Sequence, residues 1–426
     1  MWHGSRVMSP AVAALIRLAE AAYACSDPAT YRQRWPLPLL EGITNPDRSQ
    51  LMSIAAFACR DELHAAVQAL SEVPDLAVFL PSGGSFGPTL VYPGGSMGQS
   101  FESFIVALLA SAAQRFYFFR QESTVDAFIE AVIENCEDFF RQGRDEPIRV
   151  YDLIGYTGVE LEPGQQVNTP WGILRAAPQN FNVGLAFNRT TAILAAPRKM
   201  KLKVSRESRP TQFPVDDLIY PSIVGARQLL PMAFALGSKQ NPICAPMVTF
   251  ETALLPLVEL NSYRYPGILF PIQPTSRPSP QELRDTEAWA KRLEVSREGT
   301  LQIAERRLVS AIAQRSEKAD ALIDAVIAWE SLVGPRNNPT SVVPEALANL
   351  IESDPAARPD LQRKLKKIYD TRSRVVHGDL ADGEKVSAAS SEAIRIGLSA
   401  VSKLHELSGD WLTVTSETRA IRLRSS

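Results

Sequence analysis

The residues of this chain with the clearest potential for chemistry lie between Tyr369 and Gly378, in the run YDTRSRVVHG. The 426 residues contain four histidines, and one of them, His377, follows Arg372 by five positions. An imidazole can transfer protons near neutral pH, and a guanidinium binds phosphate oxygens through a planar fork of donors. The run therefore predicts either metal-free cleavage of a phosphodiester or a charged helix terminus without chemistry.

A helix expected over 318–333 would lie against this run. Its buried stripe is predicted by the helical spacing of Leu322, Val326, Trp329 and Val333. Glu330 lies on the apolar row that Ile323 begins, seven residues earlier. Because an unpaired carboxylate is costly to bury, Glu330 needs a partner, and a guanidinium from the facing helix, such as Arg372, would neutralise it.

The facing helix is expected over 359–376, with Gly378 as its stop signal. On an ideal helix five residues turn through about 140°, so Arg372 and His377 would point in different directions. Two arrangements would bring them together. Either the helix is distorted near its end, or two chains of a symmetric dimer combine their groups in one cleft.

Two motifs in this region resemble the HEPN superfamily, and most of all its Apea-like branch, which is associated with abortive infection. They are LIDAVIAWESL at 322–332 and Y-x-x-R-S-x-x-V-H-G at 369–378. The resemblance covers residues 280–410 and implies a helical bundle that dimerises, often as a metal-independent endoribonuclease. It maps Arg372 and His377 onto the catalytic pair. Ser373 stands where many active members carry an amide.

The resemblance leads us to expect an endoribonuclease, of a phage-defence or toxin type, whose N-terminal region senses a trigger or binds a regulatory protein. The ribose 2′-hydroxyl would attack the adjacent phosphorus, His377 would transfer a proton, and Arg372 would neutralise the phosphoryl oxygens. The products would be a 2′,3′-cyclic phosphate and a 5′-hydroxyl. The expected supporting residues are Glu330, Tyr369, Ser373 and Arg374, with Lys366 and Lys367 as RNA contacts.

Two further interpretations remain open. The same basic helix is compatible with a module that binds RNA or nucleotides without cutting them. The helical region could also act only as a dimerisation scaffold. Salt-sensitive RNA binding without cleavage would favour the first of these, because phosphate contacts release counterions.

The sequence predicts an α+β protein in three segments. Residues 1–145 read as mainly helical, and 146–270 as a β-rich α+β region. These two segments could together form a sensor or regulatory domain. A proline-rich linker at 271–280 precedes a HEPN-like helical domain at 281–426.

Three lysines, Lys199, Lys201 and Lys203, alternate with apolar residues and so would share one face of a strand. One interpretation is a track that contacts the backbone of RNA. The other is a solvated edge strand, which lysines protect from aggregation.

Composition limits the classes of partner and cofactor. A formal net charge of -2 gives no global attraction to nucleic acid, so RNA binding must come from local patches. The four cysteines are widely scattered, which argues against a zinc site and a disulfide framework and favours a reducing, cytoplasmic setting. The longest apolar run, 104–113, is too short to cross a bilayer, so we expect no membrane association. We expect no metal or cofactor.

Overall fold

The computed structural model divides the chain into two compact units. The first unit comprises residues 1–155, 176–220 and 249–266, and the second comprises 156–175, 221–248 and 267–426. The structure describes residues 9–26, 48–81, 89–92, 95–98, 100–119, 124–177, 190–205, 221–239, 243–256, 275–335, 337–378 and 382–425.

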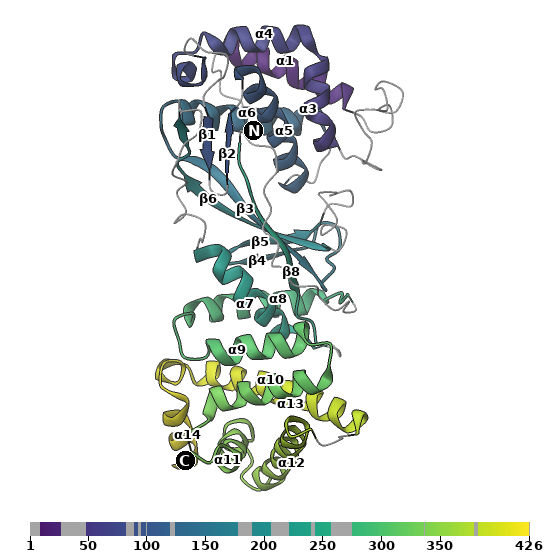
Figure 1. Ribbon diagram of the computed structural model, residues 1–426, viewed down its shortest axis with the longest axis vertical. Helices are drawn as coiled ribbons and strands as arrows, with labels where there is room; N and C mark the ends of the chain where they lie inside the picture. Colours follow the sequence, from purple (N-terminus) through teal and green to yellow (C-terminus); the bar gives the residue numbers. More distant parts are fainter. Residues whose placement is uncertain are drawn as a thin grey trace. The chain divides into compact units, whose positions relative to one another are not determined.

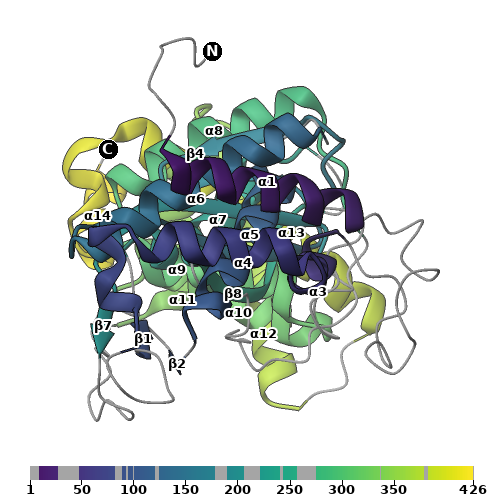
Figure 2. The same cartoon turned by 90° about the horizontal axis from the view of Figure 1, so that it is seen from above.

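Most of the described residues of the first unit lie in helices (Figure 1). Helix α1 begins where Ser9 Oγ accepts a hydrogen bond from the Val12 backbone N–H, at 3.3 Å, with Pro10 in the first turn. Helices α1 and α4 run side by side (Figures 1 and 2). The helices are α1 (Pro10–Cys25), α3 (Arg48–Ala58), α4 (Arg60–Ser71), α5 (Phe101–Phe119) and α6 (Val125–Gly143), with a 3-10 turn η2 (Pro74–Phe79).

The apolar stripe of α6 builds the core of this unit. Phe128, Val132 and Phe139 are fully buried at helical spacing. The Phe139 ring packs on Phe79 of η2, with ring centroids 4.7 Å apart. Burial of such aromatic rings contributes about 25 cal/mol for each Å² removed from water, which is why this stripe fixes the face of α6.

The strands in the described part of the chain form two sheets. A three-stranded sheet has the order β2-β1-β7, and a five-stranded sheet has the order β4-β5-β6-β3-β8. The bounds are β1 (Thr89–Tyr92), β2 (Gly95–Gly98), β3 (Ile148–Thr157), β4 (Gln166–Thr169), β5 (Gly172–Ala176), β6 (Ala192–Met200), β7 (Lys203–Ser205) and β8 (Met247–Leu254).

The mixture of helices and sheets confirms the α+β class. The division into two units does not follow the expected segments 1–145, 146–270 and 281–426. Strands β3, β5 and β8 each contain a boundary between the units, so the residues of the expected middle segment are shared between them.

Most helices of the second unit lie around α10, and the unit also contains strand β4. Helix α8 begins with a capping box, in which Ser279 Oγ accepts from the Glu282 N–H and the Glu282 carboxylate accepts from the Ser279 N–H. The helices are α7 (Pro221–Gly237), α8 (Pro280–Val295), α9 (Gln302–Val309), α10 (Lys318–Val333), α11 (Pro339–Ile351), α12 (Arg358–Val376), α13 (Gly383–Leu407) and α14 (Ser416–Ser425), with a π-helical turn η5 (Ser310–Gln314) and a 3-10 turn η6 (Gly409–Leu412).

The guanidinium of Arg419 on α14 is fully buried and holds the end of α10. It donates to the backbone carbonyls of Leu332 at 2.6 Å and Val414 at 2.7 Å, and to Thr300 Oγ1 at 2.8 Å. Among the described residues no carboxylate pairs with it, and burial lowers its pKa to about 10. Carbonyls at the C-terminal end of α10 offset the buried charge, because that end of the helix dipole is negative.

No helix in the described part of the chain combines the length and the apolar character that a bilayer span requires.

We predict that Arg419→Met lowers the free energy of unfolding by about 2–4 kcal/mol, because buried carbonyls then lose their donor. The matched control is Arg422→Met on the same helix, because the Arg422 side chain is 39% exposed and pairs with Asp410. That surface pair should contribute less than about 1 kcal/mol. Urea titrations of both variants measure the difference, and equal costs would refute the role given to Arg419.

A second prediction concerns Cys136 on α6, whose pKa burial raises to about 12. In the folded state the thiol then stays protonated, whereas in the unfolded chain it ionises near pH 8.5. The contribution of Cys136 to the free energy of unfolding is therefore lost as the pH rises from about 9 to 12. The free energy of unfolding of the wild type, relative to Cys136→Ala, should fall by about 1.4 kcal/mol per pH unit above pH 9. A difference that stays constant between pH 8 and 11 would contradict the burial of this thiol.

Candidate functional site

Helix α10 is the element against which the candidate site is built. It runs from Lys318 to Val333, as the sequence predicts, and its expected stripe of Leu322, Val326, Trp329 and Val333 is buried. Trp329 Nε1 donates to the Ala393 carbonyl of α13 at 3.0 Å. A Cβ added at Gly397 of α13 would lie 3.4 Å from Trp329 Nε1 and 2.6 Å from a Leu308 methyl carbon, so only glycine fits there without a shift of its neighbours.

Helix α12 packs on α10 and α11, and its Leu365, Ile368 and Tyr369 side chains are buried. The Tyr369 hydroxyl donates to Glu330 Oε1 at 3.2 Å, and its ring lies 6.0 Å from the Trp329 ring. Burial, followed by the adjacent Glu330 carboxylate, raises the pKa of Tyr369 well above its usual range. The phenol therefore remains a hydrogen-bond donor to the half-buried Glu330.

The expectation that a guanidinium would neutralise Glu330 is wrong. No ion pair to Glu330 occurs among the described residues, and Tyr369 is its hydrogen-bond partner instead. A tyrosine can satisfy the carboxylate while its ring fills the apolar seam between the helices, without the desolvation cost of a second charge.

Arg372 continues the buried face of α12, four residues after Ile368. Its side chain is half-buried, and its Nε atom is buried without a hydrogen-bond partner. No carboxylate in the described part of the chain pairs with it, although its positive charge is close enough to lower the pKa of Tyr369 slightly against the larger opposing effects. A buried donor without an acceptor is costly, so turning this half-buried side chain toward an anion outside the chain would sacrifice no hydrogen bond of Nε.

His377 is the C-cap residue of α12, and its side chain is exposed. Its backbone N–H donates to the Ser373 carbonyl at 3.0 Å. Gly378 follows with φ +77°, and its N–H donates to the Val375 carbonyl at 3.2 Å, which confirms the predicted helix stop. The imidazole is therefore open to solvent, as a group that exchanges protons with a substrate must be.

The two proposed catalytic groups point away from each other. Helix α12 is an unbroken α-helix to Val376, so the alternative of a distorted helix end is excluded. At about 100° per residue, the side chains of Arg372 and His377 leave the helix about 140° apart. Ser373, which is exposed, lies one turn before His377 on the same face. Within one chain, Arg372 is thus grouped with Tyr369 on the packed side, and His377 with Ser373 on the solvent side.

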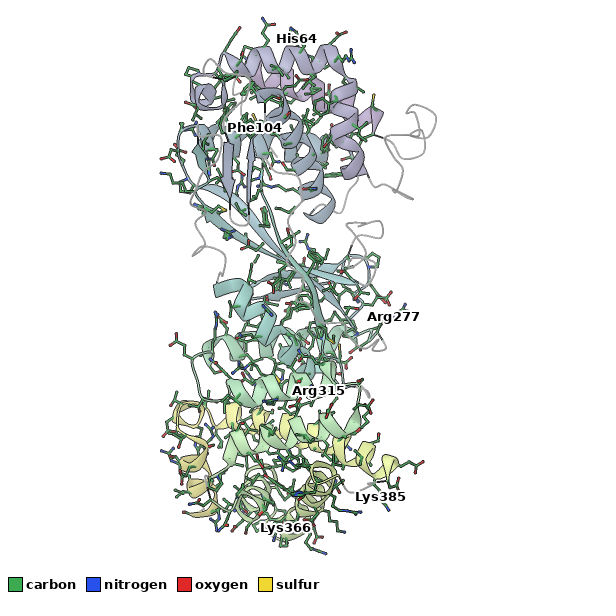
Figure 3. The ribbon with its side chains drawn as sticks, in the orientation of Figure 1. His64, Phe104, Arg277, Arg315, Lys366 and Lys385 are labelled. Atoms are coloured by element: carbon green, nitrogen blue, oxygen red, sulfur yellow. The ribbon has the colours of Figure 1, made fainter. Side chains whose placement is uncertain are left out.

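The solvent side of α12 carries exposed basic residues, of which Lys366 is labelled in Figure 3. Lys366 and Lys367 are exposed and make no ion pair with another described residue, and Arg374 is exposed beside them. Lys364, in contrast, is held by Glu392 of α13 at 2.5 Å. Eleven residues turn an ideal helix through about three full turns, so Lys366 and His377 share one row. A phosphate chain could follow that row to the imidazole.

The lysines of the first unit do not form the expected face of one strand. Strand β6 ends at Met200 and β7 begins at Lys203, in a different sheet. Lys199 is exposed, whereas Lys201 pairs with Asp145 at 2.5 Å, and the side chain of Lys203 lies outside the described side chains. Because β7 is an edge strand of the three-stranded sheet, Lys203 lies where a protective lysine is usual.

Sequence reasoning overlooked a second polar group on α10. Asp324 is buried and accepts hydrogen bonds from Arg307 at 2.7 Å, Ser310 at 2.9 Å and Arg315 at 2.7 Å. These donors flank or belong to η5, so the carboxylate holds the π-helical turn. The sequence does indicate this buried polar group, because Asp324 interrupts an apolar stretch in the way that Glu330 does. In the described ranges, no group of three or more His, Cys, Asp or Glu side chains is arranged to hold a metal ion.

Known proteins provide no relative of this arrangement. No family model, curated protein or solved structure matches the chain. The resemblance to HEPN domains therefore depends on the two motifs of α10 and α12, and the function must be argued from the chemistry of the residues described above.

The contact between Tyr369 and Glu330 predicts a measurable coupling. In a double-mutant cycle with Tyr369→Phe and Glu330→Met, the unfolding free energies should be non-additive by about 1 kcal/mol, because the hydrogen bond is lost only once. A control cycle pairs Tyr369→Phe with Glu345→Met, since Glu345 bonds to Arg424 instead. Urea unfolding provides the values, and additivity in both cycles would contradict the contact.

Proposed function

We propose that the second unit is a metal-independent endoribonuclease whose site combines Arg372 and His377 in a homodimer. The observation that supports this most is the half-buried Arg372 guanidinium, which pairs with no carboxylate and whose Nε has no acceptor within the described part of the chain. A guanidinium with free donors beside a basic helix face is suited to a phosphoryl group, which it can bind with two parallel hydrogen bonds.

The reaction uses the nucleophile that RNA itself carries. His377 accepts the proton of the ribose 2′-hydroxyl, and the oxygen attacks the adjacent phosphorus. The bond to the 5′-oxygen breaks, that oxygen takes a proton from water, and the His377 imidazolium returns its proton to the resulting hydroxide. Arg372 neutralises the charge that develops on the phosphoryl oxygens. The products are a 2′,3′-cyclic phosphate and a 5′-hydroxyl, so DNA, which lacks the 2′-hydroxyl, is not cut.

A dimer solves the geometric problem of the site. Because Arg372 and His377 diverge on one α12, a scissile phosphate between them requires a second copy of the helix. A two-fold axis near the end of α12 would place the arginine of one chain against the histidine of the other. The exposed side chain of Val376, 49% accessible, lies next to His377 and could be covered in such a contact.

Lys366 and Lys367 of α12 guide the RNA backbone to this site, and the first unit acts as the part that senses a trigger or binds a regulatory protein. An effector of this kind fits a defence or toxin function in the cytoplasm. The competing function is RNA binding without cleavage. It is favoured by Ser373, because a hydroxyl there replaces the amide that many active HEPN domains carry.

Purified protein in EDTA should cleave single-stranded RNA to products with a 2′,3′-cyclic phosphate, read by gel electrophoresis and mass spectrometry. His377→Ala should slow cleavage by about 10²–10⁴-fold, because general acid–base help is lost. Arg372→Ala should slow it by about 10²–10³-fold, as expected for a lost transition-state donor.

The matched controls are His64→Ala, an exposed histidine of α4, and Arg363→Ala, an exposed arginine of α12. Both should retain the wild-type rate within a few-fold. Binding of RNA with no cleavage by the wild type would favour the non-catalytic function, and cleavage that survives His377→Ala would refute the proposed site.

A further inference from the structure

Two of the four cysteines, far apart in sequence, meet in the first unit. Cys25 is the last residue of α1, and Cys59 lies between α3 and α4. Their sulfur atoms are 3.9 Å apart, with the Cys59 thiol oriented toward Cys25 Sγ. Neither residue forms a disulfide. The widely spaced cysteines of the sequence gave no sign of this pair, because the packing of α1 on α3 and α4 creates it.

The surroundings of the two thiols differ in a way that assigns them separate roles. Cys25 is half-buried, so a small molecule in solvent can reach it, whereas only 9% of Cys59 is accessible. Burial, and then the adjacent Cys25, raises the pKa of Cys59 to about 12. Since the thiolate is the nucleophile, Cys59 is a poor first attacker, and Cys25 is the point of entry.

The two sulfur atoms need to move only a short distance to form a disulfide. A disulfide has its sulfur atoms about 2.05 Å apart, so the two must approach by about 2 Å. Cys59 is the N-cap residue of α4, but its side chain makes no capping hydrogen bond, so rotation of the side chain breaks no contact with the helix end. Cys136 and Cys244, the other two cysteines, are buried, and neither has a cysteine neighbour in the described residues.

We propose that Cys25 and Cys59 form a reversible dithiol–disulfide site that reacts with low-molecular-weight disulfides. The Cys25 thiolate attacks one sulfur of the small disulfide and expels one thiolate, leaving a mixed disulfide on Cys25. Cys59, after losing its proton, attacks Cys25 Sγ and expels the second thiolate. Two protein thiols lose two electrons, and the small disulfide gains them as it becomes two thiols.

The product ties the end of α1 to the junction of α3 and α4 and closes the chain between them into a loop. The inference is independent of the proposed nuclease, because it concerns the first unit alone and does not require RNA. It gives that unit a chemistry with which it can respond to the thiol–disulfide balance of its surroundings.

The test treats the full-length protein with oxidised glutathione, blocks remaining thiols with N-ethylmaleimide, and maps peptides by mass spectrometry. The wild type should become two hydrogen masses lighter, carry no glutathione, and yield a linked Cys25–Cys59 peptide that dithiothreitol releases. Cys59→Ser should instead trap glutathione on Cys25, and Cys25→Ser should yield neither product. Cys136→Ser is the matched control and should still form the link.

Several results would overturn the proposal. They are an unreacted wild type, glutathione retained on Cys25 of the wild type, and modification of Cys136 or Cys244 as fast as Cys25. The wild-type reaction decides the question even if a serine variant does not fold, because the linked peptide is formed only by the native pair.

Discussion

The packing around Trp329 is the constraint on which the candidate site depends. Its ring is fully buried on α10, its indole N–H is bonded to α13, and the Tyr369 ring of α12 lies beside it. These contacts fix the rotation of α12 about its own axis. The rotation places Tyr369 against Glu330 and leaves Arg372 half-buried one turn further along, while Lys366 and His377 face solvent.

Other buried charged groups in the described part of the chain have hydrogen-bond or ionic partners that Arg372 lacks. Arg419 bonds to three carbonyls and a hydroxyl at 3.1 Å or less, and Asp324 is held by two guanidiniums and a hydroxyl. Arg115 and Arg149 also have a buried Nε without an acceptor. Other nitrogens of Arg115 bond to Asp138 and a carbonyl, and Arg149 Nε lies 3.9 Å from the same carboxylate. Arg372 has no such compensation among the described residues. A ligand with phosphate chemistry is the physical account that we favour for it.

The sequence was sufficient for the elements that carry strong periodic signals. The bounds of α10 and the end of α12 at Val376, shortly before Gly378, were predicted correctly, because an apolar stripe and a glycine stop are local features. The partner of Glu330 was predicted wrongly. A tyrosine hydroxyl and a guanidinium can both donate a hydrogen bond to a carboxylate, and the residue types alone do not show which of them lies near it. The break between β6 and β7 was also missed, because alternation continues through Lys201 although the chain changes sheets there. The division into two units depends on long-range strand pairing, and the meeting of Cys25 with Cys59 on helix packing, neither of which leaves a local pattern.

The central claim is that a scissile phosphate lies between α12 helices of two chains. It is tested most directly by a heterodimer with Arg372→Ala in one chain and His377→Ala in the other, purified through two different tags. Our account predicts that this heterodimer cleaves RNA at a substantial fraction of the wild-type rate, although each variant homodimer is inactive, because one intact arginine and one intact histidine then meet across the interface. A heterodimer as inactive as the two homodimers would contradict a shared site.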